Sequence, residues 1–226
     1  MNLIRDIRVY RSETENIAGN PLPAVFINHA LCHTLRRITM KLHETGFSMG
    51  GFHHLYVNLT TCAVPEQLAP AKRGRDRYSP WYRWYDAEIS RELYDLLETP
   101  QCIEPVIGII TRLMQRYFST ETLDADAIAR CISEAVTQGE QMLVKYKEKQ
   151  SAKQKAVLYL RYTDGGLYRP LLRVFDSEDR LILEQNLPET AVPDTLGEIQ
   201  LSAKKVTARP RKSAAVQGIP AVTFPL

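Results

Sequence analysis

The spacing of apolar residues changes between positions 46 and 52, and this change constrains the fold more than any other feature of the sequence. Before it, apolar side chains recur at spacings of three and four and would share one helical face: Ile27, Leu31, Leu35, Ile38 and Leu42. Asn28 is a suitable N-cap, and Gly46 stands where a left-handed residue often ends a helix. The pattern predicts a helix over residues 28–45.

After two glycines the sequence FHHLYVNLT, residues 52–60, alternates between residue classes. Such alternation predicts a half-buried strand. Its two faces would carry different side chains, with Leu55, Val57 and Leu59 on one and His54, Tyr56 and Asn58 on the other.

Three further segments have the apolar spacing of amphipathic helices: residues 86–98, 104–117 and 124–149. Acidic residues begin the last of them and lysines end it, which suits the helix dipole. Residues 63–80 contain three prolines and a basic run. We expect a loop there.

Beyond residue 155 the pattern becomes that of β-structure. Two runs, 156–162 and 167–175, flank Asp164-Gly165-Gly166, which is typical of a hairpin turn. Pro170 removes a backbone donor inside the second run, which predicts an edge strand or a bulge. Residues 180–187 and 198–208 each predict one more strand.

These patterns predict an α+β protein that is helical in its N-terminal two-thirds, with one embedded strand, and forms an antiparallel β-meander in its C-terminal third. We expect a mainly helical α+β domain over residues 1–150 and an antiparallel β segment over residues 151–209. Residues 210–226 are basic and contain proline. We expect them to form a tail.

Charge and cysteine content narrow the class of protein. The net charge of +3 and the pI near 8.6 are mild, whereas nucleic-acid binders usually carry a stronger basic excess. No two of the four cysteines have CxxC spacing. The sequence shows neither a signal-peptide pattern nor a run of eighteen apolar residues. We expect a cytoplasmic protein with reduced thiols and no membrane partner.

Histidines and cysteines are the first candidates for chemistry. His29 and His33 lie four residues apart, a spacing that zinc sites use, with Cys32 beside them. Cys102 lies just before a predicted helix, where the pKa of a thiol can fall. The HExxH, GxSxG, P-loop and GxGxxG patterns are all absent from the sequence.

We therefore assign no catalytic, cofactor-binding or metal-binding residue. We expect no cofactor, and we expect the protein not to be an enzyme. An enzyme whose site is assembled from dispersed His, Cys and Glu residues remains an alternative.

The segment KRGRDRYSPWYRWY, residues 72–85, contains both tryptophans and five basic residues. It could be a protein-binding surface, because Trp, Tyr and Arg are enriched at binding hot spots. It could also hold single-stranded nucleic acid on its arginines and rings. In a third interpretation the tryptophans are core residues at the start of the next helix. The candidate partner-binding residues are Arg73, Arg75, Arg77, Tyr78, Trp81, Tyr82 and Trp84.

One order of elements resembles a known family. A helix ending LHETGF is followed by a glycine link, the strand FHHLYVNLTTC, a polar loop, the segment WYDAEISRELYDLLE and an apolar helix. Over residues 28–118 this order is similar to that of bacterial immunity proteins encoded beside polymorphic or contact-dependent toxins. The matching positions are Leu42, Gly46, Phe47, Gly51, Phe52, Leu55, Tyr56, Trp84, Tyr85 and Asp86.

The resemblance implies a stoichiometric inhibitor that binds its cognate protein toxin in the cytoplasm, and it brings no catalytic residues. We therefore expect a non-enzymatic cytoplasmic binding protein of the immunity type. The alternative is a nucleic-acid-binding protein that uses the Arg-, Tyr- and Trp-rich loop 72–85.

Overall fold

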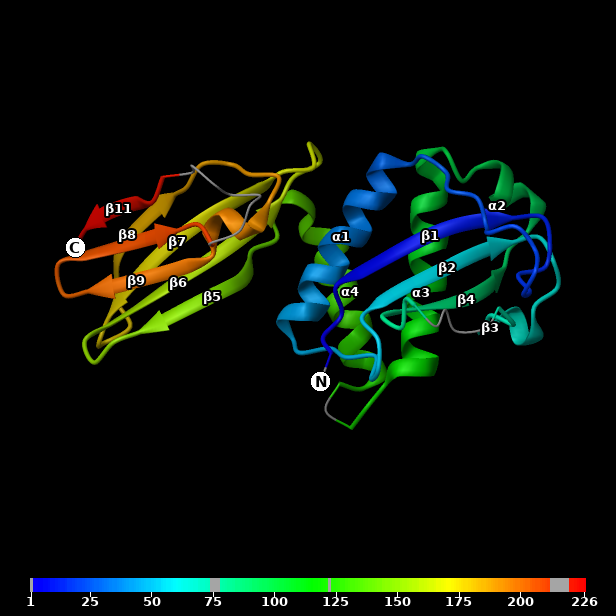
Figure 1. Cartoon of the computed structure of the whole chain (residues 1–226), viewed down its shortest axis with the longest axis horizontal. Coiled ribbons are helices and arrows are strands. Elements are labelled where there is room, and N and C mark those ends of the chain that lie inside the picture. The colour runs from blue at the N-terminus through cyan, green and yellow to red at the C-terminus, as the bar shows by residue number, and fades with distance from the viewer. Residues whose placement is uncertain (1, 74–77, 122, 212–219) are drawn as a thin grey trace. The chain divides into compact units, whose positions relative to one another are not determined.

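The computed structural model describes residues 2–73, 78–121, 123–211 and 220–226 (Figure 1). Contacts within the chain divide it into two compact units, Met1–Gly139 and Glu140–Leu226. Each unit has its own sheet structure and its own buried apolar residues.

The N-terminal unit is built on a four-stranded sheet in the order β1-β2-β4-β3. Its strands are β1 (Asp6–Ser12), β2 (His54–Thr60), β3 (Leu68–Pro70) and β4 (Tyr82–Glu88). The strands β1, β2 and β4 are parallel, and β3 runs antiparallel to β4. The register aligns Tyr10 with Asn58 and Asn58 with Asp86. Aligned residues on the three parallel strands therefore share a face of the sheet.

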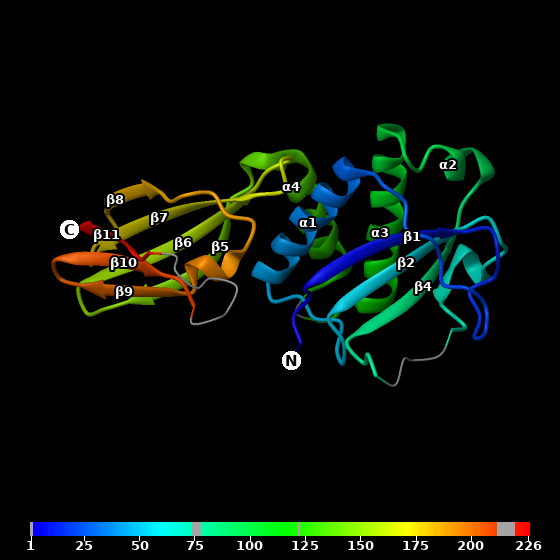
Figure 2. The same cartoon turned by 45° about the horizontal axis from the view of Figure 1, so that its top comes forward.

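The long helices of this unit lie on one side of the sheet (Figure 2). They are α1 (His29–Glu44), α3 (Ile103–Phe118) and α4 (Ala125–Gln138), and a short helix, α2 (Arg91–Asp95), follows β4. Tyr85 of β4 contacts Tyr117 and Phe118 of α3. Fully buried side chains fill the layer between helices and sheet, among them Leu35, Leu55, Leu59, Ile110 and Leu113.

The caps of α1 explain where this helix begins and ends. Asn28 Oδ1 accepts a hydrogen bond from Leu31 N at 3.0 Å, and Gly46 has a φ of +80° just beyond the last turn, which glycine adopts at little cost. Asn28 Nδ2 also donates to the carbonyl oxygens of Leu97 and Thr99, at 3.0 and 2.9 Å. One side chain therefore caps α1 and fixes the turn that precedes α3.

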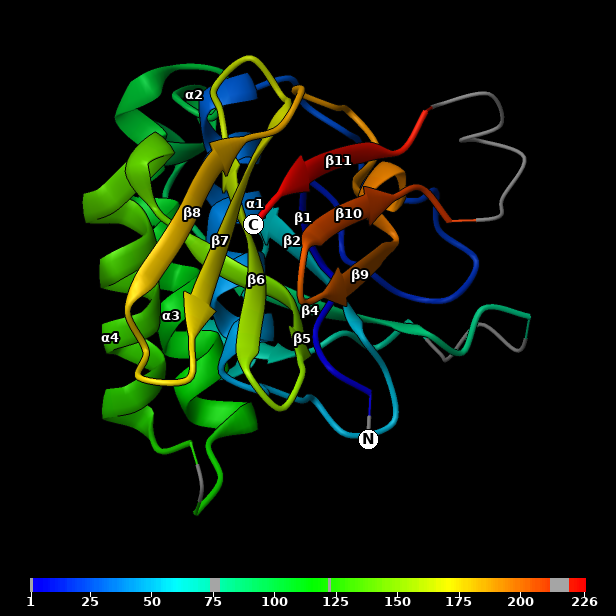
Figure 3. The same ribbon diagram turned by 90° about the vertical axis from the view of Figure 1, so that its left-hand side faces the viewer.

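The C-terminal unit consists of two antiparallel sheets (Figure 3). The first has the order β5-β6-β7-β8, and the second has the order β11-β10-β9. Their strands are β5 (Val144–Gln150), β6 (Gln154–Tyr162), β7 (Tyr168–Asp176), β8 (Leu181–Asn186), β9 (Glu198–Ser202), β10 (Lys205–Arg209) and β11 (Val222–Pro225). The chain also contains short 3-10 turns, at Pro65–Gln67, Pro100–Cys102, Gly139–Gln141 and Pro193–Leu196.

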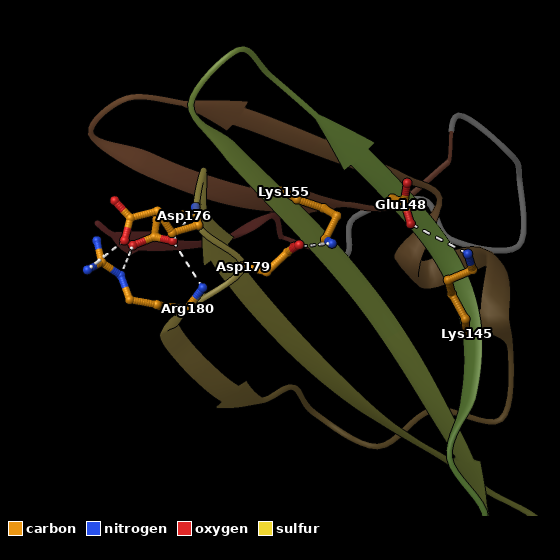
Figure 4. Close-up of polar contacts among 7 residues, drawn as sticks. Lys145, Glu148, Lys155, Asp176, Asp179 and Arg180 are labelled. Carbon is orange, nitrogen blue, oxygen red and sulfur yellow. Dashed lines mark hydrogen bonds and ion pairs between the residues drawn. The ribbon is translucent and has the colours of Figure 1, made fainter.

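Polar side chains hold the turn between β7 and β8 (Figure 4). Asp176 Oδ1 accepts from the backbone N–H groups of Glu178 and Arg180, at 2.8 and 3.0 Å, while Oδ2 accepts from Arg180 Nε at 2.7 Å. These hydrogen bonds lower the pKa of Asp176, and the bond from the Arg180 side chain has the largest effect. Lys155 Nζ of β6 donates to Asp179 Oδ1 at 2.6 Å. The charges of this cluster therefore stabilise the turn.

Several predicted elements are confirmed. The helix over residues 28–45 is α1, and the strand over 52–60 is β2. The helix over 104–117 is α3. The hairpin around Asp164-Gly165-Gly166 is formed by β6 and β7.

The prediction of a helical N-terminal two-thirds is wrong. The chain is an α+β protein, but strands dominate, since the described residues contain eleven strands in three sheets and four α-helices. The first strand of the N-terminal sheet, β1, lies close to the start of the sequence. The alternation of β1 was missed because Arg11 interrupts the apolar face that Ile7 and Val9 begin.

Two predicted helices are partly strands. Residues 82–88, whose second half was assigned to a helix over 86–98, pair with β2 as β4, and α2 begins only after Ser90, whose Oγ accepts from Leu93 N. The helix predicted over 124–149 ends at Gln138, because Gly139 turns the chain with a φ of +52°. The strand β5 follows it. In both segments the apolar residues keep a helical spacing, but pairing with a neighbouring strand determines the structure.

The C-terminal unit also corrects two strand predictions. Pro170 lies in β7, which is an interior strand between β6 and β8. It is tolerated because the ladder to β8 ends there, with Leu187 N donating to the Pro170 carbonyl at 3.0 Å. Residues 198–208 contribute to two strands, β9 and β10, and β11 from the expected tail pairs with β10.

Replacing Asn28 with Ala should lower the free energy of unfolding of the N-terminal unit by about 2–4 kcal/mol, because it removes a cap and the two hydrogen bonds that the amide donates to the Leu97 and Thr99 carbonyls. Ser90→Ala is the matched control, since Ser90 only caps the exposed helix α2, and should cost about 0.5–1 kcal/mol. Urea unfolding followed by tryptophan fluorescence reports on this unit, which contains both tryptophans. Equal losses for the two variants would contradict the second role of Asn28.

Candidate functional site

The two faces of the N-terminal sheet differ in chemistry. On the face covered by helices, β2 presents Leu55, Val57 and Leu59, which are fully buried. The opposite face carries aromatic side chains at adjacent positions of three strands. We call these four residues the aromatic face: Tyr10 of β1, Tyr56 of β2, and Tyr82 and Trp84 of β4.

The rings of the aromatic face pack against one another. Tyr10 lies 4.6 Å from Trp84 and 5.4 Å from Tyr56, measured between ring centroids. Tyr56 and Tyr82 stack at 4.7 Å with an interplanar angle of 16°, and Tyr56 meets Trp84 edge to face at 5.2 Å. The ring contacts hold each side chain in place before any partner binds.

Polar groups border these rings. The Arg8 guanidinium lies 5.7 Å from the centre of the Tyr56 ring, within the range of a cation–π contact. Burial, with the neighbouring Tyr56, raises the pKa of Tyr10. Its hydroxyl therefore stays protonated at neutral pH and can donate a hydrogen bond. The aromatic face combines apolar rings with polar donors.

A polar network continues the same face toward the carboxyl ends of the parallel strands. Asp86 Oδ1 accepts from Asn58 Nδ2 at 2.9 Å and from Asn16 Nδ2 at 3.0 Å. Asn16 lies in the segment after β1 and is buried. Its Oδ1 accepts from Arg73 Nε at 2.6 Å. The network therefore joins the segment after β1 to the sheet.

Arg73 has a structural role in this network. Its NH2 group also donates to the carbonyl oxygens of Asn20 and Pro21, at 3.2 and 3.0 Å. The guanidinium thus holds both the side chain of Asn16 and the backbone that follows it. This residue, which was predicted to contact a partner, also fixes a loop at the edge of the aromatic face.

Burial raises the pKa of Asp86, and the hydrogen bonds from Asn58 and Asn16 offset part of this effect. The carboxyl group lines a small cavity of about 60 Å³ together with Asn16, Thr60 and Cys62. The position agrees with the rule that sites in parallel sheets lie near the carboxyl ends of the strands. The carboxylate, however, already accepts two amide donors, as expected of a structural group.

The predicted partner-binding residues differ in their position and exposure in the structure. Tyr82 and Trp84 join the aromatic face on β4, where Trp84 is 9 % exposed, rather than starting a helix. Trp81 is 42 % and Tyr78 87 % exposed. Arg75 and Arg77 lie outside the described residues. The Trp81 ring nevertheless contacts Tyr82, with ring centroids 6.4 Å apart, and Arg73 lies at the edge of the aromatic face.

Three residues of the site were not predicted: Tyr10, Asn16 and Arg8. Tyr56 was noted only in the alternating pattern and in the family resemblance. The signal that could have found them is the alternation in β1, where Arg8 and Tyr10 stand opposite Ile7 and Val9. The role of Asn16 depends on long-range contacts and has no local signal.

The histidine and cysteine candidates give no reactive arrangement. Cys102 is fully buried, its Sγ donates to Leu97 O at 3.3 Å, and burial raises the pKa of its thiol. His29 and His33 lie side by side, with ring centroids 6.3 Å apart. In the described part of the chain, no three His, Cys, Asp or Glu residues are grouped so that they could hold a metal ion.

Comparisons of the chain with protein-family models, with characterised proteins and with solved structures give no significant match. Among residues 2–73, 78–121, 123–211 and 220–226, no helix has the length and apolar character that crossing a membrane requires.

The buried carboxyl of Asp86 predicts a specific pH dependence. Because its pKa is raised in the folded protein, the folded state binds this proton more tightly than the unfolded chain, so the contribution of Asp86 to stability increases as the pH falls. The free energy of unfolding of the wild type relative to Asp86→Asn should therefore rise between pH 7 and pH 4 and level off below the ordinary aspartate pKa. Urea titrations at several pH values, followed by tryptophan fluorescence, measure this difference. A constant difference, or one of opposite slope, would contradict it.

Proposed function

We propose that this chain is a non-enzymatic protein that binds one partner protein in a fixed ratio, in the manner of the bacterial immunity proteins that residues 28–118 resemble. The partner would be a cognate protein toxin, and the complex would form in the cytoplasm. The proposed binding surface is the aromatic face of the N-terminal sheet.

The observation that supports this proposal most strongly is the mutual packing of the four rings. Tyr and Trp supply large contact areas with few rotatable bonds, which makes them effective in binding surfaces. Here the rings are already fixed by one another, so binding would cost little further side-chain entropy. The side of the sheet that carries them has no helix of the described N-terminal unit on it (Figure 2).

Two observations favour a protein partner over a nucleic acid. Stacking on a base requires an accessible ring face, but Tyr56 and Tyr82 stack on each other and Trp84 is buried. In addition, residues 1–139 contain fifteen Lys and Arg against sixteen Asp and Glu. The unit with the aromatic face thus lacks the basic excess of nucleic-acid-binding domains.

The proposal predicts that Tyr56→Ala weakens the complex by at least about 2 kcal/mol, or roughly thirtyfold, because it removes the ring that contacts all three others. The partner is isolated with the immobilised full-length chain from the native cytoplasm. Its affinity and stoichiometry are then measured by titration calorimetry on the purified proteins. Circular dichroism and tryptophan fluorescence confirm that each variant is folded.

Tyr159→Ala is the matched control. Tyr159 lies on β6 of the other unit and has a guanidinium, that of Arg173, 5.5 Å from its ring centre, which matches the contact of Tyr56 with Arg8. Its replacement should change the affinity less than threefold. If the two variants weaken the complex equally, the aromatic face is not part of the interface. If no partner protein binds in a fixed ratio, the proposed function is wrong.

A further inference from the structure

A cavity of about 590 Å³ lies beside the N-terminal half of β4, next to the aromatic face. The pairing of β3 with β4 ends at Pro70, opposite Tyr85, and one more backbone bond follows, from Ala71 N to Trp84 O at 3.1 Å. The segment around Gly51 lines the cavity from another direction. Its volume falls within the range of ligand sites in proteins, roughly 300–1,000 Å³.

The walls of this cavity combine apolar and cationic side chains. Met49, Phe52, Pro70, Tyr82 and Trp84 supply apolar and aromatic surface. Three cationic residues, Lys72, Arg73 and Arg83, also line it, and no carboxylate does so among the described residues. Because three cationic side chains and no described carboxylate line this cavity, its walls carry a local positive charge in a unit that has no net positive charge.

The cations are held in different ways. Arg73 is fixed by its hydrogen bonds to Asn16 and to the backbone, and the Arg83 guanidinium lies 5.3 Å from the centre of the Phe52 ring. The ammonium group of Lys72 lies 3.6 Å from Glu15 Oε2, and both side chains are more than half exposed. Such exposed pairs contribute little. An incoming carboxylate can therefore replace Glu15 as the partner of Lys72.

We infer that the partner protein places an acidic segment in this cavity, with carboxylates against the three cations and an apolar side chain against Phe52 and Met49. The inference rests on the proposed function, because it gives the chemistry of the same partner. Charge complementarity of this kind raises the rate of association and selects among partners. A nucleic acid is the competing occupant, which the test below distinguishes.

The test uses an acetylated peptide, Glu-Glu-Leu-Glu-Glu, titrated into the full-length chain. Trp84 lines the cavity, so tryptophan fluorescence reports binding. We expect a saturable change and an affinity at least tenfold higher than that of Gln-Gln-Leu-Gln-Gln. Equal affinity for the two peptides, or no saturable change at millimolar peptide, would overturn the inference.

Lys72→Glu should weaken binding of the acidic peptide at least tenfold. Lys72 is highly exposed, so its replacement leaves the fold intact. Lys145→Glu is the matched control, since Lys145 forms a similar exposed pair with Glu148, at 3.5 Å, in the other unit (Figure 4), and it should leave the affinity unchanged. If Lys72→Glu binds the acidic peptide as tightly as the wild type, this cavity is not the binding site of the peptide.

A nucleic acid is tested by competition. Displacement of the peptide by a ten-residue oligothymidine that binds more tightly would overturn the inference in favour of nucleic acid.

The inference and the proposed function can fail separately. If the partner protein binds Lys72→Glu as tightly as the wild type while Tyr56→Ala weakens the complex, the function stands and the acidic segment is excluded. If the acidic peptide binds as expected but no protein binds in a fixed ratio, the cavity is acid-selective and the proposed function is wrong.

Discussion

The parallel, in-register pairing of β1, β2 and β4 is the constraint on which the candidate site depends. Because aligned residues of the three strands share a face, Tyr10, Tyr56 and Trp84 meet although they are separated by long stretches of sequence. The same register aligns Asn58 with Asp86. A shift of one residue in any strand would turn its ring toward the helices and expose apolar core residues.

This constraint changes the meaning of the basic segment 72–85. The sequence pattern indicates one binding loop, but in the structure the described residues of this segment belong partly to a loop and partly to the strand β4. Arg73 fixes the segment after β1, Tyr82 and Trp84 belong to a strand, and Lys72 and Arg83 line the cavity beside that strand. The proposed interface is therefore a rigid sheet face with a charged cavity at its edge, a kind of surface that loses little entropy on binding.

The sequence correctly predicted those helices and strands that have caps, turn residues or regular apolar spacing within their own segment. The helix α1 has both caps and a regular apolar face, and β6 and β7 flank a strong turn sequence, so these could be found from the residues alone. The strand β4 was not predicted, because it is held by pairing with β2 and β3, which the local sequence pattern does not show. The break at Gly139 shows the same limit, since the apolar spacing continues across it.

The candidate site was predictable only in part, for the same reason. Tyr82 and Trp84 were identified by composition, which depends on residue type alone. Tyr10 joins them through long-range pairing of β1, and Asn16 through a hydrogen bond to Asp86, seventy residues away along the chain. A carboxylate buried among amides has no signature in a sequence without those contacts.

The most direct test of this account is hydroxyl-radical footprinting of tyrosine side chains, measured by mass spectrometry on the free chain and on its complex with the partner protein. The account predicts protection of Tyr10, Tyr56 and Tyr82 in the complex, with the reactivity of Tyr159 unchanged. Unchanged reactivity of the first three tyrosines in a saturated complex would contradict the claim that the aromatic face is the binding surface.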